Sequence, residues 1–214
     1  MGIKINPNID LNSLIRSATS KEFLDKQIDD IVDYLQRKYN EQFEVLRYGD
    51  REDKYNDDIK IICKSKSNPD VVFYATGNSS KKYEDNYCSR LILTELEQSI
   101  KNEFKNHEIN ANVKIDNAIK KKINMKMTLK QYIESGEDQV FLGYIVLEGE
   151  VQSSIVKQTL DNVKSNYPGI KLRAFVYRMN STNFENYCKF ANSVESTSRT
   201  IIQKYLPSKV EVIE

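Results

Sequence analysis

The chain has 214 residues, and its 32 basic and 31 acidic side chains leave a net charge of +1. This balance excludes a strong overall attraction to nucleic acid or to an anionic membrane. No apolar stretch approaches the roughly 20 residues that a membrane-spanning helix needs, so we expect no membrane span in this chain.

Residues 1–20 carry Asn, Ser and Pro without sustained periodicity, and we expect them to form an N-terminal tail. They also lack the apolar core of a signal peptide. The prediction for location is therefore conditional: cytoplasmic if Met1 is the natural start, and extracytoplasmic if an upstream signal was removed.

A helix is predicted from Thr19 or Ser20 to Tyr39, because apolar residues recur at helical spacing. Its expected buried stripe is Leu24, Ile28, Ile31, Val32 and Leu35. Alternating residues then predict strands at Phe43–Tyr48, Asp58–Cys63 and Val71–Ala75, joined by short turns as in an antiparallel meander. A long helix over Ser80–Asn106 and a strand over Ile109–Ile115 complete the first half.

The second half repeats helix-to-strand units. We expect a short helix over Thr128–Ser135, a strand at Val140–Glu148 and a helix that ends at Tyr167. A strand at Lys171–Tyr177, a helix over 182–205 and a last strand at Lys209–Ile213 follow. The strand Val140–Glu148 is apolar on both faces, which is typical of a central strand covered by helices.

These elements predict an α+β fold with antiparallel sheets covered by helices. The two similar-sized halves read α-β-β-β-α-β, over 21–116, and α-β-α-β-α-β, over 117–214. We place the boundary at Asp116–Lys126, which is rich in lysine and weakly patterned.

The segment Tyr34-Leu35-Gln36-Arg37-Lys38-Tyr39 leads into Phe43-Glu44-Val45, and Tyr83-Glu84-Asp85-Asn86-Tyr87 precedes Leu93 and Leu96. Over about residues 20–105 this resembles an uncharacterised family of low-GC Gram-positive lipoproteins or surface-anchored proteins, which carry "YLxxKYGxxFEV" and "YxDNY" segments. This chain has Asn40 where that family has Gly, and it lacks an export signal. The resemblance implies a surface location and no particular activity.

Metal-binding and catalytic patterns are scarce. His107 is the single histidine. Its predicted place is the C-terminal end of a helix, where the helix dipole stabilises a cationic ring, and this structural role is sufficient to explain it. Cys63, Cys88 and Cys188 form no CxxC pair, so we expect buried thiols and not a zinc site. The loop 50–58 offers five carboxylates, but it lacks the central Gly and the final Glu of a calcium loop, and a solvated loop is the favoured interpretation.

The one basic concentration consists of Lys114, Lys120, Lys121, Lys122, Lys126 and Lys130. Because no aromatic or arginine is interleaved with these lysines, base stacking and bidentate readout are not supported. We expect a solvated face and no nucleic-acid partner.

Four tyrosines are candidates for an interaction surface: Tyr83, Tyr87, Tyr177 and Tyr187. Tyrosine suits either an adhesive surface or the edge of a core, and we favour the core edge. The repeated Asn-Tyr-Cys at 86–88 and 186–188 would mark equivalent corners if the halves were related.

The resulting prediction is a non-catalytic binding or structural module with no catalytic residue, metal or cofactor. It would act on an unknown protein or envelope partner, as the soluble part of a bacterial cell-envelope protein. Two alternatives stay open: a metal-dependent hydrolase that uses the 50–58 loop, and a nucleic-acid-associated protein that uses the 114–130 lysines.

Overall fold

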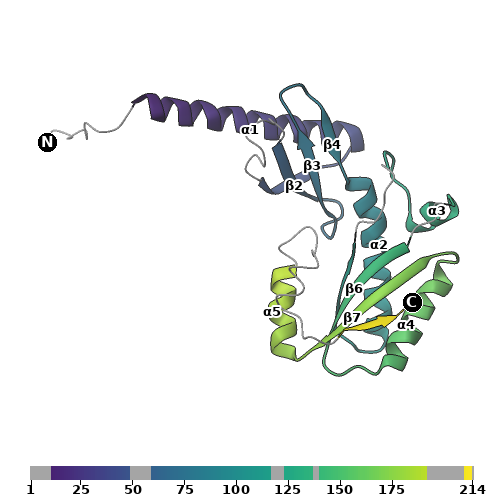
Figure 1. Ribbon diagram of the computed structural model, residues 1–214. Helices are drawn as coiled ribbons and strands as arrows, with labels where there is room; N and C mark the ends of the chain where they lie inside the picture. The colour runs from purple at the N-terminus through teal and green to yellow at the C-terminus, as the bar shows by residue number, and fades with distance from the viewer. Residues whose placement is uncertain (1–10, 49–58, 117–122, 137–139, 192–209, 214) are drawn as a thin grey trace. The chain divides into compact units, whose positions relative to one another are not determined.

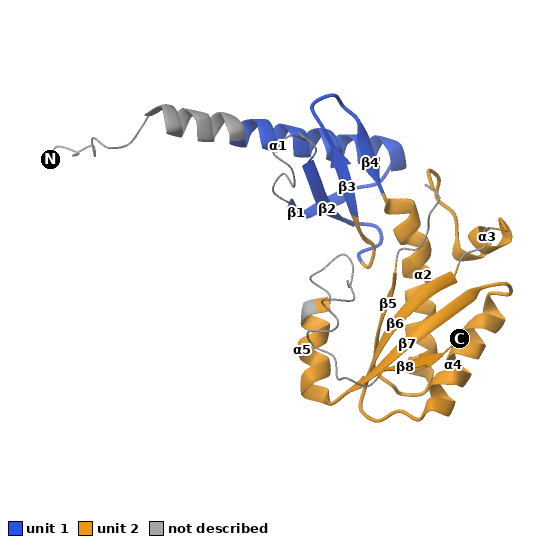
Figure 2. Ribbon diagram, viewed as in Figure 1, with its two compact units in different colours: residues 1–69, 74–85 blue, residues 70–73, 86–214 orange. Residues whose placement is uncertain are grey.

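The computed structural model of the chain describes residues 11–48, 59–116, 123–136, 140–191 and 210–213, although not the side chains of 11–20 and 190. The chain divides into two compact units (Figure 2). Unit 1 comprises residues 1–69 and 74–85, and unit 2 comprises residues 70–73 and 86–214. The fold contains two four-stranded sheets with helices, which confirms the predicted α+β class.

Unit 1 is built on the long helix α1 (Leu11–Tyr39), which packs against a sheet of order β1-β2-β3-β4. The strands are β1 (Phe43–Tyr48), β2 (Ile59–Ser65), β3 (Val72–Gly77) and β4 (Tyr83–Asp85). The described pairings are antiparallel, as expected for a meander: β1 pairs with β2, and β3 with β4.

The buried face of α1 differs from the expected stripe by about one position. Gln27, Ile31, Leu35 and Tyr39 are the buried residues, at intervals of four, whereas Ile28 is half-buried. Residues four apart lie on one side of a helix, so this line is continuous. A polar Gln therefore occupies a place in it that an apolar residue would normally fill.

The helix ends where the chain turns into β1. Asn40 adopts a φ of +52°, and its N–H donates to the Gln36 carbonyl at 2.8 Å. Gly and Asn are the residues that tolerate this left-handed conformation at a helix end. Asn40 therefore suits the backbone conformation that ends α1.

Unit 2 holds a second sheet of order β5-β6-β7-β8. Its strands are β5 (Ala111–Ile115), β6 (Val140–Glu148), β7 (Lys171–Met179) and β8 (Glu211–Ile213), and its helices are α2 (Tyr87–Asn106), α3 (Leu129–Glu134), α4 (Ser153–Asn166) and α5 (Ser181–Ala191). The strand β6 is central, as its two-sided apolar pattern predicts.

Helices cover both faces of this second sheet (Figure 1). On one face α2, α3 and α4 close a core that includes Leu96, Ile145 and Leu160. On the other face α5 places Phe184 and Tyr187 against residues of β6 and β7. A strand buried on both sides explains why 140–148 contains almost no polar residue.

Three expectations need correction. The helix α1 begins at Leu11, inside the predicted tail, and Tyr83–Asp85 is a strand and not the start of the second helix. The second sheet is mixed, because β6 and β7 run parallel through the α4 crossover. Parallel neighbours need such a connection.

The elements on either side of Asp116–Lys126 lie in one compact unit, because β5 pairs with β6 and α2 packs in the second core. Independent folding of two halves stays a prediction. Among the described residues, no helix is long and apolar enough to cross a membrane.

Candidate functional site

A pocket of about 220 Å³ lies between α1 and the turn that joins β3 to β4. We call it the Gln27 pocket. From α1 it is lined by Phe23, Lys26, Gln27 and Asp30, and from the turn and β4 by Asn78, Ser79, Lys81 and Tyr83. All of these residues belong to unit 1.

Gly77 allows α1 to approach the hairpin closely at this point. A Cβ at Gly77 would lie 2.6 Å from Ile31 Cγ1 and 2.7 Å from Tyr83 Cδ1, distances at which neighbouring atoms must move. A residue with no side chain is used where backbone and a second element meet closely. Gly77 therefore sets the spacing between the helix and the turn that together line the pocket.

The turn itself is held by Asn78. Its carbonyl accepts from the Lys81 N–H at 2.9 Å, and its side-chain Oδ1 accepts from the Lys82 N–H at 3.1 Å. Lys81 has a φ of +58°, which is uncommon for a residue with a side chain. The turn thus fixes Lys81 in a conformation that costs free energy, and Lys81 lines the pocket.

Gln27 is the most informative residue of the pocket. It is 6% exposed, and neither its Nε2 nor its Oε1 has a hydrogen-bond partner among the described residues. A buried donor or acceptor left unpaired costs about 1–3 kcal/mol, and most buried polar groups are paired. A group that is retained at such a cost, and that lines a pocket, indicates a place where a ligand completes the hydrogen bonds.

Tyr83 closes one side of the pocket in a fixed orientation. Its ring stacks on Tyr34, with centroids 4.8 Å apart and an interplanar angle of 24°, and it also packs against Gly77. Burial, followed by the charge of Asp30, raises the pKa of its hydroxyl. The phenol is therefore protonated at neutral pH and can act as a hydrogen-bond donor.

The far end of α1 is fastened to β4 by satisfied polar contacts. Asp85 accepts from the Tyr39 hydroxyl at 2.6 Å and forms an ion pair with Lys38 at 2.8 Å. Burial by itself would lower the pKa of Lys38, but the hydrogen bond and charge of Asp85 outweigh it, so the pKa is raised. These groups are paired with each other, and we assign them to the stability of unit 1.

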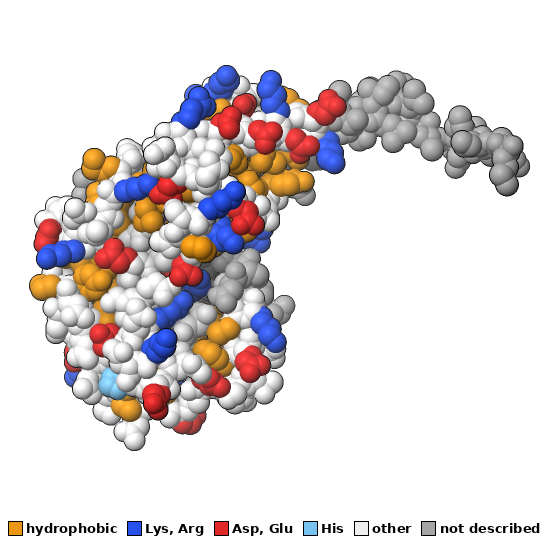
Figure 3. Space-filling view, turned by 180° about the vertical axis from the view of Figure 1, so that it is seen from behind, with side chains coloured by type: hydrophobic (Ala, Val, Ile, Leu, Met, Phe, Trp, Pro, Cys, Tyr) orange, Lys and Arg blue, Asp and Glu red, His pale blue; other side chains and the backbone are white. Residues whose placement is uncertain are grey.

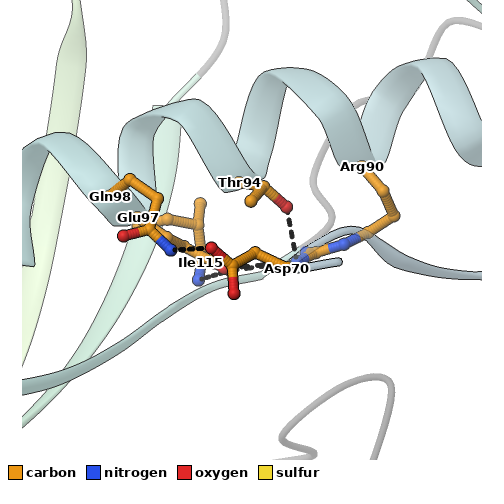
Figure 4. Close-up of polar contacts among 6 residues, drawn as sticks. All are labelled: Asp70, Arg90, Thr94, Glu97, Gln98 and Ile115. Atoms are coloured by element: carbon orange, nitrogen blue, oxygen red, sulfur yellow. Dashed lines mark hydrogen bonds and ion pairs between the residues drawn. The ribbon is translucent and has the colours of Figure 1, made fainter. Parts of the chain in front are cut away.

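Unit 2 contains a buried ion pair on α2 (Figure 4). Arg90 Nη2 lies 3.2 Å from Glu97 Oε1, and both side chains are almost fully buried. The same Glu97 oxygen accepts from the Ile115 N–H at 2.8 Å. Because Ile115 lies on β5, an edge strand, Glu97 covers a backbone group that the sheet leaves unpaired. A structural role is therefore sufficient to explain the buried ion pair of Arg90 and Glu97.

The four candidate tyrosines do not form one exposed surface. Tyr87 and Tyr187 are fully buried, Tyr177 is buried and Tyr83 is half-buried. Three of the four tyrosines therefore lie in the core, and Tyr83 lies partly at the surface. The Asn-Tyr-Cys repeat also marks different positions, since Asn86 precedes α2 whereas Asn186 lies within α5.

The lysine concentration is not a single face in the part of the chain that the structure describes. Lys126 and Lys130 are exposed, Lys114 is half-buried, and Lys120, Lys121 and Lys122 lie outside the described residues. Burial lowers the pKa of Lys114, although nearby Glu97 acts in the opposite direction. Basic and acidic side chains are also interspersed over the face in Figure 3.

The remaining candidates are the cysteines, the histidine and the acidic loop. Cys63 and Cys88 are buried, Cys188 is half-buried, and none of the three forms a disulfide. His107 is exposed at the end of α2, as predicted. The acidic loop 50–58 lies outside the described residues. Among the residues that the structure describes, no group of three or more His, Cys, Asp or Glu is placed to hold a metal.

Gln27 was not identified from the sequence, because the apolar residues Leu24 and Ile28 beside it predict a buried stripe about one position away from the observed one. The signal that could have found it is the spacing of four to Ile31, Leu35 and Tyr39. That spacing places a glutamine in line with buried residues. Neither its lack of partners nor the pocket could be read from the sequence.

Comparison with known proteins adds information on the fold. No protein-family model matches the chain, and no curated protein matches it in sequence. A crystal structure of a DUF5037 family protein from Ruminococcus gnavus ATCC 29149 is similar, with a TM-score of 0.65 and 17% sequence identity. The match covers 86% of this chain and 89% of that chain. At this identity the likeness shows a shared fold alone.

Proposed function

We propose that the protein is a non-catalytic binding module whose ligand enters the Gln27 pocket. The single observation that carries this proposal is the buried and unpaired amide of Gln27 in the pocket lining. A ligand that satisfied this amide would recover free energy that the free protein lacks. Binding then explains why the chain keeps a buried, unpaired amide at position 27.

The composition of the lining suits the binding of a small ligand. Lys26, Lys81, Asp30 and Ser79 offer polar contacts, and the Phe23 ring offers an exposed apolar one. A few polar groups beside apolar surface are typical of ligand sites.

Saturation-transfer NMR with small probes tests this proposal. The probes are N-methylacetamide, acetate, phenol, glucose and adenosine, each added to the full chain. We expect at least one probe to receive saturation from the native protein, to lose it with Gln27→Met, and to keep it with the control Gln36→Met. Gln36 is on the same helix but half-buried, and it does not line the pocket.

If no probe binds, or if the probes that bind are indifferent to Gln27→Met, the pocket is not the binding site and the proposal fails. Chemical-shift changes at residues 23–30 and 78–83 would show directly whether a probe lies in the pocket.

We further propose a location at the bacterial cell envelope. Its support is the likeness of the Tyr34–Val45 and Tyr83–Tyr87 segments to surface-anchored proteins, and the Ruminococcus gnavus neighbour agrees with a bacterial origin. Fractionation of the source cells, with detection by an antibody against the chain, tests this location. Recovery with the cytosolic fraction alone would contradict it.

A further inference from the structure

We propose that the Gln27 pocket recognises a peptide-type amide that carries a neighbouring carboxylate, as at the C-terminal end of a short peptide or in an N-acylated amino acid. This inference rests on the proposed function and names the chemistry of its ligand. Three features of the lining support it: the paired donor and acceptor of Gln27, the lysines, and the limited space.

The amide preference follows from Gln27. A carboxamide presents one oxygen acceptor and one nitrogen donor side by side. Because both atoms are buried and unpaired, a ligand must supply both a donor and an acceptor to satisfy them. A secondary amide does so, whichever way the Gln27 amide is turned. A carboxylate or an ester supplies acceptors only and would leave Oε1 unpaired.

The carboxylate preference follows from the charges of the lining. Lys26 and Lys81 are exposed and contribute two ammonium groups, whereas Asp30 contributes one carboxylate. This gives an excess of one positive charge, which suits a monoanion. The lysines therefore suit the carboxylate while Gln27 takes the amide.

The remaining features favour this ligand over a nucleotide. The Tyr83 ring is already packed against Tyr34 and Gly77, so it is not available for stacking on a base. The volume of about 220 Å³ is also below the ~300–1,000 Å³ of sites for drug-sized ligands. One acylated amino acid is a suitable size for such a site, and its small apolar side chain can contact Phe23.

Three matched probes test the proposal by chemical-shift titration of the ¹⁵N-labelled full chain. N-acetyl-L-alanine has both groups, O-acetyl-L-lactate replaces the amide by an ester, and N-acetyl-L-alanine N-methylamide removes the carboxylate. We expect N-acetyl-L-alanine to bind most tightly. The ester should bind about 5- to 10-fold more weakly, and the methylamide about 3- to 10-fold more weakly.

Two variants assign each preference to its residue. Gln27→Met should abolish the difference between amide and ester, and Lys81→Asn should reduce the difference between acid and methylamide. Asn is chosen at position 81 because it tolerates a positive φ. Each variant should leave the other preference in place, as expected for independent contacts.

The outcomes separate this inference from the proposed function. Equal binding of the amide and the ester in the pocket would overturn the amide inference and leave the binding site intact. Tighter binding of adenosine monophosphate than of N-acetyl-L-alanine would also overturn it, in favour of a nucleotide. Absence of shifts at residues 23–30 and 78–83 with all probes would remove both the inference and the proposed function.

Discussion

Replacing Gln27 by Met should make the protein more stable while it removes binding. Met has a similar length and no strong hydrogen-bonding group. The change removes two buried atoms without partners, each of which costs about 1–3 kcal/mol when fully desolvated. Because the pocket lies beside them, part of this cost is relieved by solvent. We therefore expect a gain of about 1–3 kcal/mol in the free energy of unfolding.

Urea denaturation followed by far-UV circular dichroism measures this gain, and the chain contains no Trp for a fluorescence signal. In thermal unfolding the same gain corresponds to roughly 2–8 °C or more in Tm. Gln36→Met, on the same helix at a half-buried position, should change stability by less than about 0.5 kcal/mol. A loss of 1 kcal/mol or more for Gln27→Met would refute the reasoning, because it would mean that Gln27 is paired in the folded protein.

Three further predictions follow from other contacts. Gly77→Ala should destabilise unit 1 by about 1–3 kcal/mol through overpacking against Ile31 and Tyr83, as measured by urea denaturation. The control Gly143→Ala should cost less, because a Cβ at Gly143 would lie 3.4 Å from the nearest side-chain atom, Ile115 Cδ1. Equal losses of stability would contradict the account of Gly77. Glu97→Gln should lower the free energy of unfolding by about 3–5 kcal/mol, because it leaves the buried charge of Arg90 without its ion-pair partner. The control Lys130→Ala, in a surface pair at 4.0 Å, should lower it by less than about 0.5 kcal/mol. A small loss of stability for Glu97→Gln would contradict the role given to the buried pair. Burial by itself would raise the pKa of Glu211, but Arg178 at 2.6 Å outweighs it and lowers the pKa below 4.5. The stability that this pair contributes is therefore present above about pH 4.5 and is lost as the pH falls through the lower folded-state pKa. The urea midpoint of Arg178→Met should therefore decline less in acid than that of the native chain, and parallel declines would contradict the assignment.

The helices and strands of this chain are largely predictable from the spacing of its apolar residues. Val140–Glu148 was expected as a central strand and is β6, because an apolar run with no polar face requires cover on both sides. The parallel pairing of β6 with β7 was not predicted. Both parallel and antiparallel strands give the same alternation, so the sequence pattern does not decide between them.

Other differences arise from contacts that are distant in sequence. Tyr83–Asp85 pairs with Ala75–Gly77 as a strand, although its residues were read as the start of a helix. The strand β5 pairs with β6, although a long segment of the chain separates the two strands. Pairing partners of this kind are chosen by tertiary packing, and local propensity cannot specify them.

The candidate site was less predictable than the fold. The four tyrosines suit either a core edge or an interaction surface in the sequence, and three of them are core residues. Gln27 stood out only when its burial and its unpaired atoms were known. A glutamine on an exposed helix face and one in a buried line look alike in a single sequence, since both are flanked by the same charged residues.

A crystal structure of the chain soaked with N-acetyl-L-alanine tests the central claim most directly. The account predicts the amide of this probe in the Gln27 pocket, with its N–H and carbonyl about 2.7–3.2 Å from Oε1 and Nε2 of Gln27. A structure in which Gln27 instead bonds to groups of the protein, with the pocket closed and the probe elsewhere or absent, would contradict it.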